Sequence, residues 1–249
     1  MSRKIEELAW ADTPMGELVL RRRVEPTLQV DVYEVKLGDE FLMSSLFTDS
    51  EVALARLGLA ATPDPSSDAS PGGRSPGAGL DDLVGGLGLG YTARTVLEDD
   101  RVGSLVVVDA LPEVVDWHVR HLLPGSAALT ADPRTRLVVG DFFALARAEG
   151  GLDPEQPGRR FDAVLVDIDH TPDHVLHPSH ADFYSPEGLG RVKGCLHPGG
   201  VFGLWSDDPP HEGFLGVLRQ VFDDVEAHVV SFANFHTGGQ SACTVYVAR

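Results

Sequence analysis

The chain has 249 residues, enough for a full hydrophobic core, and its 38 acidic against 20 basic residues give a formal net charge of −18. A surface this negative repels nucleic acid and anionic membranes, so we expect neither as a partner. The two cysteines, Cys195 and Cys243, show no disulfide or zinc spacing, and no apolar run reaches the roughly 18 residues of a membrane span, so a cytoplasmic protein is expected.

The first 60 residues predict a small β-rich domain. Apolar residues alternate with polar ones at 17–20, 30–36 and 40–46, which is typical of strands joined by hairpins, and a short helix is expected to begin near Thr48. Residues 61–79 are rich in proline, glycine, serine and aspartate. That composition indicates a flexible linker or disordered loop before the rest of the chain.

Residues 80–249 alternate predicted strands with predicted helices. Strands are expected at 80–84, 104–109, 136–140, 161–167, 200–205, 227–232 and 244–248, and helices at 91–98, 112–122, 142–148, 186–196 and 210–222. Continuous apolar runs such as LVVV and AVLV indicate strands that are covered on both faces. The predicted fold is therefore α/β, a doubly wound, mainly parallel Rossmann-like sheet that ends in an antiparallel pair.

The first strand of this sheet runs into the glycine-rich sequence GGLGLG. Glycines in a first strand-to-helix turn let the main chain approach a ligand, and the helix that follows offers free N–H groups. The second strand ends at Asp109, where a carboxylate can accept both hydroxyls of a ribose. Asp141 follows the third strand, where it can bind the adenine amine, cap the helix that begins at Phe142, or do both. Together these residues predict a nucleoside site.

Two nucleosides fit the glycines. Gly88, Gly90 and Ala93 satisfy the loose dinucleotide pattern G-x-G-x-x-G/A, whereas Gly86, Gly88 and Gly90 form the G-x-G-x-G turn typical of S-adenosylmethionine sites. A nicotinamide enzyme would also require a second mononucleotide-binding half and a substrate domain, for which the chain has little room. S-adenosylmethionine is therefore favoured.

Residues 80–249 resemble the catalytic domain of the spermidine synthases, the polyamine aminopropyltransferases, within the class I S-adenosylmethionine-dependent methyltransferase fold. The landmarks occur in the family's order: GGLGLG, VVVDALPEVV, VVGD, FDAVLVDIDHTP, FYSPEGL and LHPGGVF. The resemblance implies S-adenosylmethionine or its decarboxylated form as cofactor, and a homodimer formed with help from the small β-domain. By the same resemblance the cofactor-binding residues are Gly86, Gly88, Gly90, Asp109 and Asp141.

The family's D-x-x-D-P loop is altered here. Asp167 matches its catalytic aspartate and ends the fourth predicted strand, so it is the expected general base. His170 occupies the fourth position, with Asp169 one residue short, and the family's upstream D-E-x-x-Y-x-E stretch has its nearest counterpart at 48–54, without the tyrosine. Asp169, His170 and Tyr184 are therefore the candidates for binding the small-molecule acceptor, whose identity stays open.

Four histidines between residues 170 and 180, with aspartates among them, could form a metal site. Pro172 and Pro178 interrupt the helix that would align these side chains, so we expect no metal and instead a polar, mobile lid over the site.

Three functions remain: an aminopropyltransferase-like enzyme, an S-adenosylmethionine-dependent small-molecule methyltransferase, and a non-catalytic adenosyl-nucleoside-binding protein. Both transfers are in-line displacements at a sulfonium, in which positioning supplies much of the acceleration. They differ in the cofactor carboxylate, which the intact form would present to a basic or amide group; Arg94 and Gln29 are the candidates.

Overall fold

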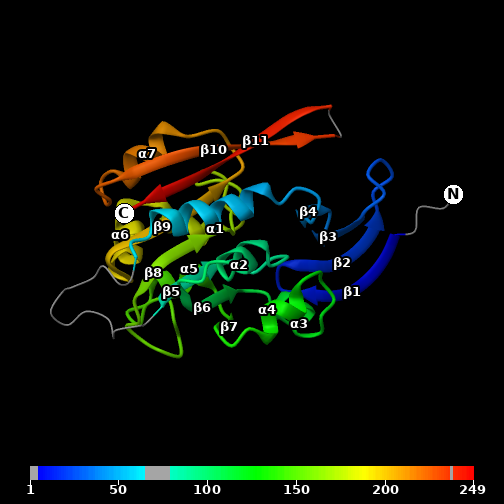
Figure 1. The fold of residues 1–249 in the computed structure, drawn as a ribbon, viewed down its shortest axis with the longest axis horizontal. Helices are drawn as coiled ribbons and strands as arrows, with labels where there is room; N and C mark the ends of the chain where they lie inside the picture. Colours follow the sequence, from blue (N-terminus) through cyan, green and yellow to red (C-terminus); the bar gives the residue numbers. More distant parts are fainter. Residues whose placement is uncertain (1–4, 65–78, 236–237) are drawn as a thin grey trace.

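The computed structural model describes residues 5–64, 79–235 and 238–249. An antiparallel sheet with the order β1-β2-β3-β4 lies at one end of the molecule (Figure 1). Its strands are β1 (Ile5–Thr13), β2 (Gly16–Val24), β3 (Asp31–Leu37) and β4 (Glu40–Ser44). The sequence did not predict β1, an edge strand whose register shifts between Glu7 and Ala9, because most of its residues stay exposed or half-buried and its apolar alternation is broken.

A second sheet has seven strands in the order β10-β11-β9-β8-β5-β6-β7. The strands are β5 (Leu80–Gly85), β6 (Val102–Asp109), β7 (Thr135–Val139), β8 (Phe161–Val166), β9 (Leu196–Ser206), β10 (Val225–Asn234) and β11 (Gly239–Ala248). Strands β5 to β9 are parallel to one another, whereas β11 runs antiparallel to both β9 and β10. The predicted doubly wound sheet with an antiparallel pair at its edge is confirmed.

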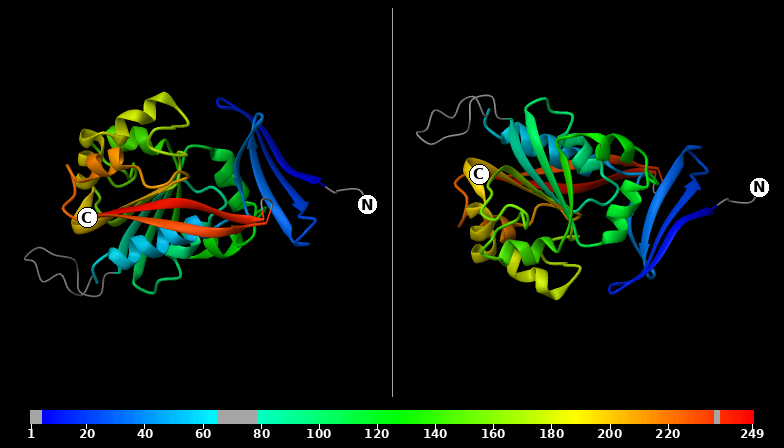
Figure 2. Two further views of the ribbon diagram at one scale, coloured as in Figure 1. Left: turned by 90° about the horizontal axis from the view of Figure 1, so that it is seen from above. Right: turned by 90° about the horizontal axis from the view of Figure 1, so that it is seen from below.

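Helices cover both faces of this sheet. They are α1 (Asp49–Ala61), α2 (Tyr91–Val96), α3 (Pro112–Val119), α4 (Ser126–Ala131), α5 (Phe142–Arg147), the 3-10 helix η2 (Pro178–Tyr184), α6 (Pro186–Gly194) and α7 (Glu212–Leu218). The side chains of each strand alternate between two buried clusters, one beneath α1 to α4 and one beneath α5 to α7. Figure 2 shows α1 on one side of the sheet and α6 and α7 on the other. Burial on both faces explains the unbroken apolar runs.

Helix α1 packs against the seven-stranded sheet, although its residues fall in the range 1–60 that the sequence assigned to the β-rich domain. Two glycines permit the close approach: a Cβ on Gly58 would lie 2.5 Å from Leu165, and one on Gly203 would lie 3.1 Å from Leu54. Of the predicted linker at 61–79, Ala61 ends α1, and residues 65–78 lie outside the described residues.

The small sheet lies beside the carboxyl ends of the parallel strands (Figures 1 and 2). Leu18 and Leu20 of β2 belong to the same buried cluster as Leu87 and Leu89 of the glycine turn. The small sheet therefore helps to enclose the edge of the large sheet where ligands bind in doubly wound folds.

Candidate active site

A cavity of about 620 Å³ opens at the carboxyl ends of β5, β6, β8 and β9, beneath β4 and the first turn of α1. Its walls include every cofactor-binding residue that the sequence predicted and the predicted base: Gly86, Gly88, Gly90, Asp109, Asp141 and Asp167. Residues that are up to 81 positions apart in the sequence thus meet at one switch point of the sheet, as the strand order requires.

The glycine turn needs its glycines for backbone reasons. Gly86, Gly88 and Gly90 have φ angles of +94°, +48° and +84°, in the left-handed region that favours glycine. A Cβ on Gly86 would also collide with the main-chain oxygen of Asp167, and one on Gly90 would lie 2.8 Å from the His118 ring. These positions therefore shape the cavity floor through backbone alone.

Asp109 ties this turn to the end of β6. Its carboxylate accepts the backbone N–H of Leu87 at 2.9 Å and that of Leu111 at 2.8 Å. Burial raises the pKa of Asp109, and the N–H groups that it accepts oppose this rise. A carboxylate offers about four lone-pair sites, so Asp109 can hold the turn and still accept ribose hydroxyls.

Asp141 is exposed at the rim and caps α5, because its carboxylate accepts the backbone N–H of Ala144 at 3.0 Å. The capping role that the sequence allowed is therefore present. The second role, contact with adenine, stays a prediction.

Asp167 follows β8, and hydrogen bonds hold both its backbone and its carboxylate. Its N–H donates to Gly85 at 2.8 Å, and its Oδ2 accepts the Thr92 hydroxyl at 3.0 Å. Burial, and secondly the carboxylate of Glu51, raise the pKa of Asp167 to about 7. A carboxylate with this pKa suits a general base near neutral pH.

Glu51 is a cavity residue that the sequence did not single out. It lies in α1, where its Oε2 accepts the Ser50 hydroxyl at 2.7 Å, and burial raises its pKa. The sequence signal that could have identified Glu51 is the stretch 48–54, which is the nearest counterpart of the family's acidic stretch upstream of the glycines. The packing of α1 on the large sheet could not be read from that stretch, and this packing brings Glu51 to Asp167.

The structure places the three residues that were predicted to bind the acceptor in different surroundings. His170 lines the cavity, whereas Asp169 and Tyr184 are buried and do not belong to its walls. The carboxylate of Asp169 accepts the Tyr184 hydroxyl and the Leu176 N–H, each at 2.8 Å, and lies 2.9 Å from His180 Nδ1. A buried carboxylate with three such partners is satisfied by the protein itself. Asp169 and Tyr184 thus hold the loop behind the cavity.

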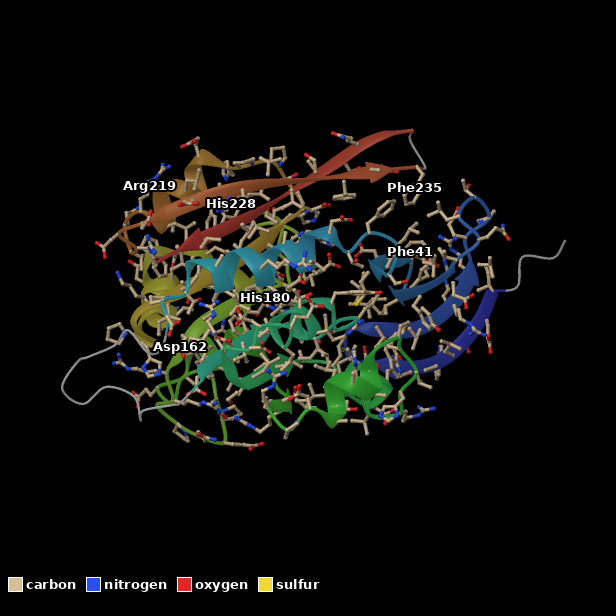
Figure 3. All side chains as sticks on the ribbon, viewed as in Figure 1. Phe41, Asp162, His180, Arg219, His228 and Phe235 are labelled. Carbon is tan, nitrogen blue, oxygen red and sulfur yellow. The ribbon has the colours of Figure 1, made fainter. Side chains whose placement is uncertain are left out.

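His180 is one of the side chains that this loop presents to the cavity, together with Leu176, His177 and Ser179. Its ring stacks on Phe143 with centroids 3.8 Å apart, and Figure 3 labels it among the side chains near the centre of the view. Within 5–64, 79–235 and 238–249, no group of three or more histidine, cysteine or acidic side chains is arranged to hold a metal ion.

The cavity is strongly acidic. Its walls carry five carboxylates, from Glu51, Asp109, Asp141, Asp167 and Asp207, and no lysine or arginine among the described residues. The two candidates for a cofactor carboxylate lie elsewhere: Arg94 donates to the Pro124 carbonyl at 3.2 Å, and Gln29 donates to the Pro26 carbonyl at 2.6 Å. Such a cavity favours cationic over anionic ligands.

Comparison of sequences identifies similar proteins named polyamine aminopropyltransferase 2. The one from Pseudomonas aeruginosa is 30% identical over 161 residues, which are 62% of this chain and 43% of the relative. The one from Hyperthermus butylicus is 32% identical over 161 residues, 63% of this chain and 49% of the relative. The chain thus spans less than half the length of these relatives. No protein-family model matches the chain.

Solved structures resemble the whole fold. Spermidine synthase from Thermotoga maritima aligns with a TM-score of 0.68 and 17% identity over 99% of this chain and 74% of its own. Human methyltransferase-like protein 13 in complex with SAH aligns with a TM-score of 0.56 and 18% identity over 80% of this chain and 82% of its own. The class I fold and the resemblance to the aminopropyltransferases are thereby confirmed. None of the helices in the described ranges has the length and apolarity needed to cross a bilayer.

Proposed function

We propose that the protein transfers an aminopropyl group from decarboxylated S-adenosylmethionine to a small amine. The amine nitrogen attacks the methylene carbon bound to the sulfonium, the new C–N bond forms as the C–S bond breaks, and methylthioadenosine leaves with the electron pair. Asp167 takes the proton that the acceptor ammonium must lose. The similarity to polyamine aminopropyltransferases supports this reaction class.

The charge of the cavity is the observation that carries the proposal. Decarboxylated S-adenosylmethionine and an amine acceptor are both cations, and five carboxylates line the cavity without a lysine or arginine among the described residues. Intact S-adenosylmethionine adds a carboxylate, for which Arg94 and Gln29 are not available in the cavity walls. Methyl transfer is therefore the second candidate.

The residues fit the adenosyl part of this substrate. Backbone at Gly86 and Gly88 approaches the cavity without side chains, and Asp109 lies beside it with lone pairs for the ribose. Asp141, at the rim, is the proposed partner of the adenine amine. The sulfonium supplies its own leaving group, so the protein mainly positions the reactants and accepts a proton.

Asp167→Asn tests the assignment of the base. Asparagine has nearly the shape of aspartate, so calorimetry with methylthioadenosine should find binding unchanged. Because asparagine cannot accept the proton, turnover should fall by about 10² to 10⁴. Mass spectrometry of the wild type with a panel of amines and small acids separates the reactions: methylthioadenosine marks aminopropyl transfer, and S-adenosylhomocysteine marks methyl transfer. Methylthioadenosine binding with neither product would indicate a non-catalytic nucleoside-binding protein.

We also propose a cytoplasmic homodimer that uses the outer face of the small sheet. Trp10, Val19, Lys36 and Phe41 lie opposite one another across its four strands, and Trp10 and Phe41 are each 55% exposed. Both cysteines are free thiols, in keeping with a reducing compartment. Sedimentation should find a dimer in the wild type and a monomer in Trp10→Glu; a wild-type monomer contradicts the dimer.

A further inference from the structure

The glycine turn is supported by a buried histidine that lies outside the cavity. His118, in the last turn of α3, has no exposed surface and does not belong to the cavity walls. Its Nε2 lies 2.9 Å from the carbonyl oxygen of Gly88, and a Cβ on Gly90 would lie 2.8 Å from its ring. Because the turn lines the cavity and His118 does not, the ring contacts the turn from behind.

The partners of this ring fix which nitrogen carries the proton. A carbonyl oxygen can only accept, so Nε2 of His118 donates its N–H to Gly88. Nδ1 lies 3.1 Å from the hydroxyl of Ser126, the first residue of α4, and accepts this hydroxyl when the ring is neutral. Burial lowers the pKa of His118, which favours the neutral ring. Helices α3 and α4 lie side by side (Figure 1), and the ring connects both of them to the glycine turn.

The carbonyl that His118 holds belongs to a peptide that the turn itself leaves free to rotate. Gly90 donates its N–H to the Leu87 carbonyl at 2.8 Å, which closes a β-turn with Gly88 and Leu89 at its centre. Turn types that share this closing hydrogen bond differ in the orientation of their central peptide. Gly88, with a φ of +48°, is compatible with more than one orientation. The hydrogen bond from His118 therefore selects one of them.

The same orientation decides where the Leu89 N–H points. The peptide bond between Gly88 and Leu89 is trans, so this N–H points opposite to the Gly88 carbonyl and away from His118. Gly88 and Leu89 both line the cavity, and the Leu89 N–H has no hydrogen-bond partner within the described part of the chain. A backbone donor without a protein partner at a cavity wall is available to a ligand.

We infer that His118 is a positioning residue of the nucleoside site, which holds the Gly88 carbonyl away from the cavity so that the Leu89 N–H donates to the bound nucleoside. This inference rests on the proposed function, because it adds one contact to the adenosyl part of that substrate. Without the donor at position 118, the central peptide of the turn can rotate and present a carbonyl oxygen to the ligand instead of an N–H. The loss should appear in nucleoside binding and not in proton transfer to Asp167.

His118→Leu and His118→Gln test the inference by calorimetry with methylthioadenosine. Leucine is apolar and cannot donate, so the affinity should fall by about tenfold or more, and the KM for decarboxylated S-adenosylmethionine should rise equally while kcat stays within about threefold. Glutamine can place an amide N–H near the position of Nε2, so His118→Gln should stay within about threefold of the wild type in affinity. Val192→Ala is the matched control, because Val192 is as deeply buried but lies in α6, in the other buried cluster. It should lower the melting temperature and leave the affinity within about twofold.

Amide hydrogen exchange, followed by NMR, separates this inference from the proposed reaction. In the protein without ligand, the Gly90 N–H should exchange faster in His118→Leu than in the wild type, and His118→Gln should restore the slower exchange. Methylthioadenosine should slow the exchange of the Leu89 N–H in the wild type. If the wild type binds no methylthioadenosine, the proposed nucleoside site fails, whereas the exchange of Gly90 still decides whether His118 holds the turn.

Three results would overturn the inference. They are equal affinity and exchange in His118→Leu and the wild type, equal losses in His118→Leu and His118→Gln, and a Leu89 N–H that bound methylthioadenosine does not protect. If His118→Leu fails to fold, Ser126→Ala replaces it, because this change removes only the hydroxyl that orients the ring. Ser126→Ala should weaken methylthioadenosine binding by about threefold. Unchanged affinity in that variant would likewise count against the role of His118.

Discussion

Glu51→Gln is expected to move the pH dependence of turnover. The pKa of the Asp167 carboxyl is raised from its ordinary value of 3.8 to about 7, and burial is the largest cause, followed by the Glu51 carboxylate. A rise of about three pH units corresponds to about 4 kcal/mol in favour of the protonated form. Because Glu51 is the smaller of the two raising causes, we expect its removal to lower the pKa of Asp167 by about 1 unit, or about 1.4 kcal/mol.

The assay is kcat/KM for methylthioadenosine formation between pH 5 and 9. Activity requires ionised Asp167, so the wild-type profile should rise with a midpoint near 7. In Glu51→Gln the midpoint should lie near 6, so that a larger fraction of the plateau activity is retained at pH 6. The position of the midpoint is the measurement, since the plateau also reflects acceptor binding.

Asp49→Asn is the matched control. Asp49 is exposed in the same first turn of α1 and does not line the cavity, so its loss removes an equal charge from the same helix. Its midpoint should stay within about 0.3 units of the wild type, because exposed charges are screened. A Glu51→Gln midpoint that equals the wild type, or that moves upward, refutes the electrostatic pairing of Glu51 with Asp167.

Three further predictions concern binding and stability. Asp109→Ala should weaken methylthioadenosine binding by roughly 1 to 3 kcal/mol in calorimetry, while Asp116→Ala, an exposed change on α3, should not. Gly86→Ala should lower the melting temperature and the affinity for methylthioadenosine, because its φ is +94° and its Cβ meets the Asp167 carbonyl, whereas Gly190→Ala, which has open space, should be neutral. Burial, and then Asp162 and Asp81, raise the pKa of Asp82 well above its ordinary value, so the folded state is destabilised as pH rises above about 4. Asp82→Asn should therefore stabilise the protein by roughly 1 to 3 kcal/mol at pH 8 and little at pH 4 in thermal denaturation; equal effects at both pH values would contradict this.

The large sheet could be predicted because its signals are local. Phe161–Val166 is buried at every position, so its apolar run needs no partner to be recognised as a strand. The glycine turn, Asp109 and Asp167 follow from the ends of such strands, and the cavity gathers them as the switch-point rule predicts. Strand β1 was missed because it lies at an edge, where neither face imposes a clear alternation.

The part of the cavity around Glu51 and Asp167 depends on packing between distant segments, which local sequence patterns do not encode. Glu51 reaches Asp167 only because Gly58 and Gly203 let α1 lie close to the large sheet. Asp169, next to the expected base in sequence, turns inward and is satisfied by Tyr184. Its closeness in sequence to the expected base could not show that Asp169 faces away from the cavity, and nothing in the local sequence distinguished it from His170, which lines the cavity.

The arrangement of carboxylates also has a cost for the folded protein. The pKa of Asp167 is higher in the folded state than in an unfolded chain, so the folded protein loses stability as pH rises from about 4 through about 7, and the full penalty persists above that pH. No lysine or arginine among the cavity-lining residues of the described ranges offsets this negative charge. A cationic substrate supplies the missing countercharge, so it should stabilise the protein more at pH 8 than at pH 5. The same unpaired charge that destabilises the empty site is thus what recognises two cations and prepares Asp167 to accept a proton.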